Sequence, residues 1–306
     1  MSNNNPKNSM MQIRNALTQS AEQLNQLMQA DFPDQTHDAL AEQLESLSKL
    51  HNKIDALQTS QKNIANRLGK EIRNASKQIE AFISVENYFN TGNLPSVSSE
   101  SHAWPISPDL SLFLIEMLES EHYDLIIEFG SGYSTLLIAR VLQQQLLRSP
   151  DKPQPYQIAF EHLEHYHEKT RKQLELHQLH DKVNVIHTPL KKWKSEDDNV
   201  YPYYSCVSAL RKVKKTLGSS PRKILVLVDG PPGSTGKHAR YPALPIINSI
   251  FPQQAIDYVL DDYIREDEKE ITKLWLEYLE RHSRKVSVQE RKLEKDVCVI
   301  RVDAAA

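Results

Sequence analysis

The feature that most constrains the fold is a regular alternation of short apolar runs with longer amphipathic stretches, which begins after residue 108. Each apolar run has the length of a strand, and each amphipathic stretch has the spacing of a helix. Strands that alternate with helices favour a mainly parallel sheet covered by helices. The strand-like runs are YDLIIEF (123–129), QIAF (157–160), VNVIH (183–187), KILVLV (223–228) and AIDYVL (255–260).

Two short segments near the C-terminus alternate between apolar and polar residues. They are KVSVQER (285–291) and DVCVIRV (296–302), and they follow a helical pattern at 266–282. Neighbouring segments of this kind predict an antiparallel hairpin at the edge of the sheet. The predicted fold class is therefore α/β, with a mainly parallel sheet that ends in an antiparallel hairpin.

The first 90 residues have a different character, because they contain few helix breakers: Gly69 is their only glycine. Apolar residues recur at seven-residue spacing, with companions that shift by one position after Ile64, and this pattern indicates a coiled-coil seam with a stutter. We expect residues 1–90 to form a helical oligomerisation region that makes a homo-oligomer. The alternative is an intramolecular hairpin in which residues 10–30 fold back across DFPDQ. The main series is Leu40, Leu47, Ile54, Leu68, Ala75 and Phe82.

Residues 91–108 are predicted to be a linker, and residues 109–306 the α/β domain. The chain has 37 basic and 40 acidic residues, a formal net charge of −3, which gives no general attraction to nucleic acid. Its two cysteines lie far apart and fit a reducing compartment. No apolar run is long enough for an integral membrane segment, so we expect a cytoplasmic protein.

The stretch DGPPGSTGKH (229–238) follows an apolar run and invites comparison with a phosphate-binding loop. Its glycine spacing does not match that motif, and His238 stands where a magnesium-binding hydroxyl is required. Pro242 and Pro245 also interrupt the helix that should follow. An ATPase of this type is kept as an alternative function.

Polar residues follow each of the first four strand-like runs. The turn Gly130, Ser131, Gly132 follows the first, with Thr135 where a dinucleotide fingerprint has its third glycine. Glycines there let a ligand approach the backbone. Glu161 ends the second run, where its carboxylate is placed to accept hydrogen bonds from ribose hydroxyls. The third run leads to Thr188 and Leu190, and the fourth ends at Asp229.

As a set, these residues resemble the class I S-adenosylmethionine-dependent methyltransferases, over residues 104–303. The resemblance implies a Rossmann-like fold with a C-terminal antiparallel hairpin and S-adenosylmethionine as cofactor. It implies that Gly130, Ser131 and Gly132 face the methionyl part of the cofactor and that Glu128 holds its amino group. It further implies that Glu161 binds the ribose, that Thr188 and Leu190 border the adenine, and that Asp229 lies beside the transferred methyl group.

Asp261 and Asp262 end the next predicted strand, so with Asp229 they are expected to meet at one edge of the sheet. This arrangement resembles the metal-dependent O-methyltransferases of the catechol and sugar-modifying types, which implies a divalent ion such as Mg²⁺ or Mn²⁺ held by three carboxylates. The alternative is that Asp261 and Asp262 cap the following helix.

Those relatives place a base two or three residues after the first metal aspartate, where this chain has Pro231 and Pro232. Lys237 and His238 are therefore the expected catalytic bases beside Asp229, unless the metal alone activates the acceptor. Arg240 and Tyr241 are expected to contact the acceptor, by charge and by stacking on a sugar face.

The predicted function is methyl transfer to a hydroxyl of a saccharide or another small acceptor, in surface-polysaccharide biosynthesis. A coiled-coil scaffold with an inactive methyltransferase-like domain is a further alternative.

Overall fold

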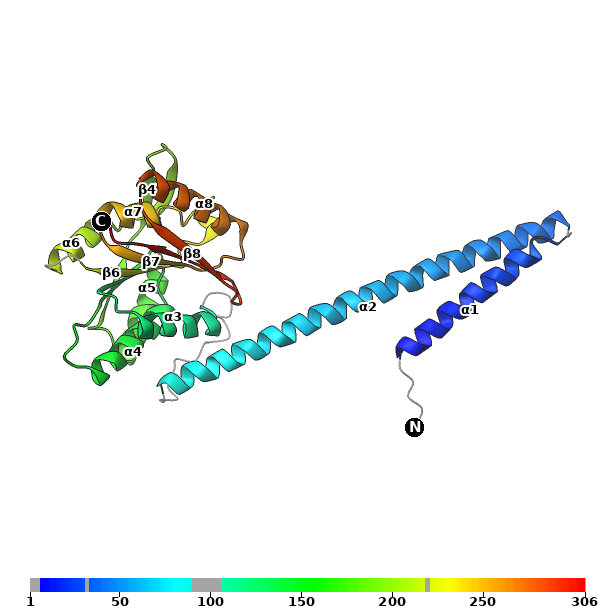
Figure 1. Ribbon diagram of the computed structural model, residues 1–306, viewed down its shortest axis with the longest axis horizontal. Helices are drawn as coiled ribbons and strands as arrows, with labels where there is room; N and C mark the ends of the chain where they lie inside the picture. Colours follow the sequence, from blue (N-terminus) through cyan, green and yellow to red (C-terminus); the bar gives the residue numbers. More distant parts are fainter. Residues whose placement is uncertain (1–5, 31–32, 90–105, 218–220, 306) are drawn as a thin grey trace. The chain divides into compact units, whose positions relative to one another are not determined.

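The computed structural model describes residues 6–30, 33–89, 106–217 and 221–305 (Figure 1). The chain divides into two compact units, residues 1–75 and 76–306. The second unit thus begins before the start predicted at residue 109, because the end of the long helix packs into it. Most of the predicted linker, residues 91–105, lies outside the described residues.

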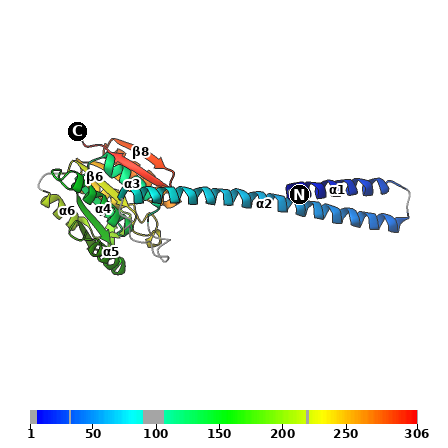
Figure 2. The same ribbon diagram turned by 90° about the horizontal axis from the view of Figure 1, so that it is seen from below.

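The first unit is built from helix α1 (Pro6–Leu27) and from the long helix α2 (Asp34–Phe89) as far as Ala75. Both views show α1 lying alongside the first part of α2 (Figures 1 and 2). Arg14 Nε lies 3.7 Å from Asp55 Oδ1, a contact between α1 and α2 that agrees with an antiparallel arrangement. The predicted intramolecular hairpin is therefore present. The less exposed apolar positions recur at helical spacing, at Leu17, Ala21 and Leu24 in α1 and at Leu40, Leu44, Leu47 and Ile54 in α2.

The second unit contains a seven-stranded sheet in the order β3-β2-β1-β6-β7-β9-β8. The first five strands of that order are parallel, and β9 pairs antiparallel with both β7 and β8. This topology confirms the predicted Rossmann-like fold with its C-terminal antiparallel hairpin. The strands are β1 (Leu125–Phe129), β2 (Tyr156–Glu161), β3 (Val183–His187), β6 (Lys223–Val228), β7 (Ala255–Leu260), β8 (Val286–Arg291) and β9 (Val297–Val302).

Helices cover both faces of the sheet, because side chains alternate between the two faces along each strand. In β1, Ile126 belongs to a core shared with the end of α2, whereas Leu125 and Ile127 belong to a core on the opposite face. Val85 and Phe89 at the end of α2 are buried in the first of these cores. The helices are α3 (Pro108–Ser120), α4 (Tyr133–Arg148), α5 (Glu164–Leu176), α6 (Val207–Thr216), α7 (Ala243–Ile250) and α8 (Glu266–Arg281), with a short 3₁₀ turn, η2 (Gly233–Thr235).

The structure contains one element that the sequence patterns did not predict. A separate hairpin of β4 (Leu190–Lys194) and β5 (Val200–Tyr204) precedes α6. Tyr201 and Tyr203, two residues apart, are buried together on the same side of β5. Residues up to Tyr204 therefore form a strand, and helix α6 begins only at Val207. Among the described helices, none is both long enough and apolar enough to span a membrane.

Candidate functional site

The carboxyl ends of neighbouring strands are joined to one another by backbone hydrogen bonds just past the sheet. The amide of Gly130 donates to the Phe160 carbonyl at 2.9 Å, and the amide of Asp229 donates to the Phe129 carbonyl at 3.0 Å. The amides of Thr188 and Asp261 make the equivalent bonds on either side, at 2.7 and 3.2 Å. The predicted site residues after β1, β2, β3, β6 and β7 thus line one edge, as expected for parallel strands.

Gly130 lies at the centre of this edge, with a φ of 105°, in a region that favours glycine. A Cβ atom on Gly130 would lie 3.5 Å from the Gly230 nitrogen and 3.8 Å from the Asp229 Cβ. The turn after β1 and the turn after β6 are therefore in contact. A Cβ atom on Gly132 would meet nothing within 4 Å, so the backbone there faces open space.

Glu161 is held by the turns on both sides of it. Its Oε1 accepts from the amides of His162 and Leu163 at 2.8 and 2.9 Å, and its Oε2 accepts from the amide of Ser131 at 3.2 Å. Burial raises the pKa of Glu161, but the hydrogen bonds from His162, Leu163 and Ser131 outweigh that effect. The pKa lies below its ordinary value, so Glu161 is a carboxylate at neutral pH.

Glu128 is buried beneath the start of α4. Its Oε1 accepts from Gln157 Nε2 at 2.9 Å, and its Oε2 accepts from the hydroxyls of Ser134 and Thr135 at 2.9 and 3.3 Å. Burial raises its pKa to about 7 in spite of these bonds. Glu128 therefore organises the first turn of α4, and its predicted contact with a cofactor amino group stays a prediction.

Thr188 and Leu190 occupy the exit from β3. Thr188 is buried, and its amide bonds the carbonyl of Glu161. Leu190 is the first residue of β4 and packs against the core on the tyrosine-rich face of the sheet. Thr188 therefore adjoins Glu161 at this edge, and the border of Thr188 and Leu190 with an adenine ring stays a prediction.

Asp229, Asp261 and Asp262 come together as predicted, with one carboxylate oxygen of each within 4.8 Å of the others. Both side-chain oxygens of Asp261 are buried and have no hydrogen-bond partner among the described residues. Burial and the neighbouring charge of Asp262 raise the pKa of Asp261, while burial and the charge of Asp261 raise that of Asp229. A buried carboxylate with free oxygens is suited to a cation.

Arg240 is 3% exposed and joins the ends of β6 and β7. Its Nη2 donates to the Asp229 carbonyl and to Asp262 Oδ2, both at 2.8 Å, and its Nη1 donates to the Asp261 carbonyl at 2.9 Å. Burial lowers its pKa, but Asp229, Asp262 and Glu268 outweigh this and raise it above the ordinary value. The described contacts of Arg240 are thus with the protein, whereas the sequence predicted contact with an acceptor.

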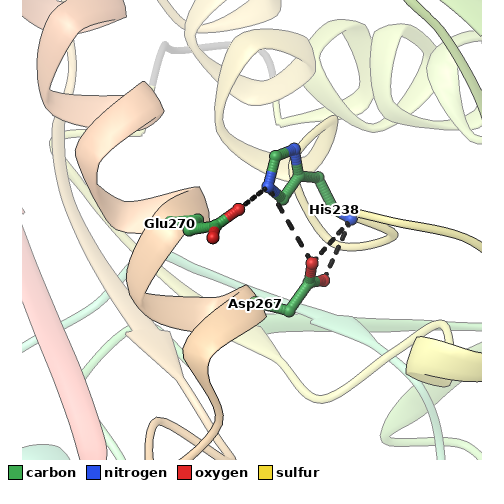
Figure 3. Close-up of side chains that lie close together, drawn as sticks. All are labelled: His238, Asp267 and Glu270. Carbon is green, nitrogen blue, oxygen red and sulfur yellow. Dashed lines mark hydrogen bonds and ion pairs between the residues drawn. The ribbon is translucent and has the colours of Figure 1, made fainter.

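Lys237 and His238 lie in the loop after η2, and both face α8. His238 Nε2 lies 2.8 Å from Glu270 Oε2 (Figure 3). Lys237 Nζ lies 2.9 Å from the same oxygen. Tyr241 is 4% exposed, and its ring centroid lies 5.1 Å from that of Tyr201. No ion pair or hydrogen bond is found between Asp229 and either Lys237 or His238 within the described parts of the chain.

Two residues at this edge were not singled out from the sequence. A Cβ atom on Gly230 would lie 2.2 Å from the Tyr204 hydroxyl, so this buried tyrosine fills the space behind the DGPPG turn. Glu268 is 2% exposed and lies 3.6 Å from Arg240 Nη1. The run YPYY and the acidic first turn of α8 were visible signals, but neither shows which side chains turn inward.

The structure also tests the phosphate-loop alternative. Such a loop leads into a helix that begins at its lysine. Here Lys237 is followed by turns, and α7 begins only at Ala243. The backbone that a Walker-type site requires is therefore missing around 229–238.

No family model matches this chain, and no curated protein matches it. Solved structures with a similar fold include an O-methyltransferase from Bacillus cereus in complex with SAH, at 17% identity and a TM-score of 0.46; 73% of this chain and 90% of that one are covered. The SAH-bound methyltransferase PaMTH1 from Podospora anserina is 12% identical, with a TM-score of 0.48 and coverages of 78% and 96%.

A third similar structure is the O-methyltransferase TomG from Streptomyces achromogenes, involved in tomaymycin synthesis and solved with SAM. It is 13% identical, has a TM-score of 0.48, and the match covers 72% of this chain and 96% of TomG. At these TM-scores the likeness does not assign an activity, so the chemistry of this chain has to follow from its own side chains.

Proposed function

We propose that the second unit is an S-adenosylmethionine-dependent O-methyltransferase that acts on a small hydroxylated acceptor, with residues 109–306 as its catalytic domain. One observation carries this proposal: Gly130, Glu161 and Asp229 adjoin at the carboxyl edge of one parallel sheet. An open glycine turn and an ionised carboxylate next to it suit a nucleoside ligand, and a second carboxylate beside them suits the acceptor.

The residues fit the proposed cofactor. Glu161 stays ionised, and its oxygens have lone pairs left for ribose hydroxyls. Ser131 and Gly132 line the open turn towards the methionyl part, with Glu128 beneath it, while Thr188 and Leu190 border the adenine. When bound, S-adenosylmethionine supplies an electrophilic methyl group, and the protein binds and orients the cofactor.

The residues also fit a divalent cation, such as Mg²⁺ or Mn²⁺, held by Asp229, Asp261 and Asp262. The free oxygens of Asp261 are the strongest support, because an unpaired carboxylate is costly to bury. Arg240 and Arg265 offset part of the negative charge of this cluster, which also includes Glu268. When bound, the ion lowers the pKa of an acceptor hydroxyl.

Asp229 is the residue best placed to act beside the acceptor hydroxyl, since its side chain is 28% exposed whereas Asp261 and Asp262 are buried. Lys237 and His238 remain alternative bases if the loop moves them away from Glu270. We propose a saccharide as acceptor, in surface-polysaccharide biosynthesis in the cytoplasm. The partly exposed ring of Trp193, which lies 6.2 Å from the ring of the buried Tyr241, supports an acceptor with a sugar face.

Calorimetric titration of the full chain with S-adenosylmethionine, S-adenosylhomocysteine and ATP tests the proposal. We expect both sulfur compounds to bind and ATP not to bind. Glu161→Gln should weaken binding by roughly 10- to 100-fold, because hydrogen bonds to a charged group are lost. Glu164→Gln, on the exposed start of α5, is the matched control. The absence of binding by either sulfur compound would refute the assignment.

The metal is tested separately by methyl transfer to a panel of sugars and catechols, with and without a chelator. Loss of turnover in the chelator and in Asp261→Asn supports a metal-dependent reaction. Unchanged turnover in both would show that the carboxylates act without an ion.

For the first 90 residues we propose a homo-oligomer formed through α2. The apolar stripe of α2 continues beyond the stretch where α1 lies alongside it, and it is exposed there: Ile64, Leu68, Ile72 and Ile79 are 51–65% exposed. An apolar stripe of this length on a charged helix is typical of helix pairing.

Sedimentation of the full chain tests this pairing. Leu68→Glu with Ile72→Glu should shift the chain to a monomer, because charges are introduced into the stripe. Asn63→Glu with Asn66→Glu adds the same charges elsewhere on the helix surface and should leave the assembly intact. A monomeric wild-type chain would refute the proposal.

A further inference from the structure

A second group of metal-ligating side chains lies outside the three-aspartate cluster, between the loop after β6 and the start of α8. It consists of His238, Asp267 and Glu270 (Figure 3). Asp267 and Glu270 are three residues apart in the first turns of α8, so their side chains lie on one face of the helix. His238 reaches that face from the loop, where it has a φ of 53°.

The donor atoms of these residues already surround one point. His238 Nε2 lies 2.8 Å from Glu270 Oε2 and 3.9 Å from Asp267 Oδ1, and all three donor atoms lie within 4.8 Å of one another. A zinc ion bound to nitrogen and oxygen at about 2.1 Å separates its ligands by roughly 3 to 3.5 Å. The observed distances bracket this value, so small side-chain rotations bring the three atoms to ligand positions.

The charges of the group also match a divalent ion. The two carboxylates carry two negative charges, and within the described residues the ammonium group of Lys237 is the one that pairs with them. Lys237 is 72% exposed, so its side chain can move into water when an ion takes its place. Asp267 is held in position by the amide of His238, which donates to both of its oxygens at 2.9 and 3.1 Å.

The three side chains are accessible to solvent to different extents. His238 is 17% exposed, Asp267 32% and Glu270 45%. Water can therefore reach the site and complete the coordination of an ion, as in sites with three protein ligands.

We propose that His238, Asp267 and Glu270 form a second cation site, for a divalent transition metal such as Zn²⁺, which ties the loop after β6 to α8. One imidazole nitrogen and two carboxylate oxygens are ligands that this class of ion accepts, whereas Mg²⁺ prefers oxygen alone. The site shares no residue with Asp229, Asp261 and Asp262. An ion bound to His238 Nε2 excludes this residue as the alternative base for the proposed methyl transfer.

Titration of the full chain with ZnCl₂ tests the site. Asp261→Asn with Asp262→Asn is the parent, because these substitutions remove the other carboxylate cluster as a competing zinc site. We expect the parent to bind one equivalent of Zn²⁺, and its melting temperature to rise as Zn²⁺ is added. Glu270→Gln and His238→Gln in this parent should each weaken binding at least about tenfold, because each removes one ligand. Glu266→Gln, on the exposed first turn of α8, is the control and should bind as the parent does.

The ¹⁵N resonances of the His238 ring report metal binding directly. They would not respond to Zn²⁺ if His238 only stabilised the loop. In ¹⁵N spectra of the parent, Zn²⁺ should shift the Nε2 resonance that is absent from His238→Gln. Failure of the parent to bind Zn²⁺ would overturn the proposal, and so would binding that Glu270→Gln and His238→Gln leave unchanged. Glu270 is half exposed, so its substitution tests the site even if His238→Gln impairs folding.

Discussion

Replacement of Glu128 by glutamine should change how the stability of the protein depends on pH. Burial raises the pKa of Glu128 from 4.5 to about 7. Between these values the folded protein keeps a proton that the unfolded chain releases. A raised carboxyl pKa therefore contributes stability that is complete below pH 4.5 and is lost as the pH rises to about 7. Glutamine is neutral throughout, so the variant lacks this dependence.

The size of the effect follows from the pKa shift. A shift of one pKa unit corresponds to about 1.4 kcal/mol. For a change from 4.5 to about 7, the free energy of unfolding of the wild type should fall by about 2.5 kcal/mol relative to that of Glu128→Gln between pH 5 and pH 8. The other titrating groups are the same in both proteins, so their contributions cancel in the difference.

Urea unfolding of the ligand-free chain at several pH values measures this difference. The emission of Trp275, which is fully buried in the core, reports the unfolding of the second unit. Glu164→Gln removes an exposed carboxylate and should run parallel to the wild type. A difference between wild type and Glu128→Gln that stays constant from pH 5 to pH 8 would show that Glu128 is not held neutral by burial.

Three further substitutions address the edge of the sheet. Arg240→Met should lower the free energy of unfolding by about 3–5 kcal/mol, because it leaves the buried carboxylates around it unpaired; a smaller loss than in an exposed-arginine control such as Arg171→Met would contradict this. Gly230→Ala should cost about 1–3 kcal/mol through its overlap with Tyr204, whereas Gly233→Ala, with open space around it, should cost less in the same urea experiment. Asp261→Asn should raise the melting temperature of the metal-free protein at pH 8, because it removes a buried unpaired charge worth about 1–3 kcal/mol. The same substitution should abolish any rise in melting temperature on addition of Mg²⁺. A lower melting temperature of the variant in metal-free buffer would argue against an unpaired carboxylate.

The sequence was sufficient to predict the order of strands and helices in the second unit, because period-two and period-3.6 patterns reflect which side chains are buried. It also placed Gly130, Glu161 and Asp229 at one edge, since parallel strands end on the same side. The final hairpin was predicted from the same alternation. These predictions depend on local patterns and on a general property of parallel sheets.

The contacts that the sequence could not predict depend on how a loop folds back. Nothing in the sequence around Arg240 shows that its guanidinium turns inward to bond the ends of two strands, rather than outward to an acceptor. His238 is similar, because its partners on α8 lie about thirty residues further along the chain. In β5, the tyrosines suited a strand or a helix, and only the packing around Tyr203 decides between them.

Backbone hydrogen bonds link the carboxyl ends of the five parallel strands, here called the strand exits, and these bonds limit how the strand ends can move. The amides of Gly130, Thr188, Asp229 and Asp261 each bond a neighbouring strand end, so the five exits form one continuous series. Opening one exit breaks a bond that also restrains the next, and such units open cooperatively. The turns after β2 and β3 and the turns after β6 and β7 are therefore expected to loosen or tighten together.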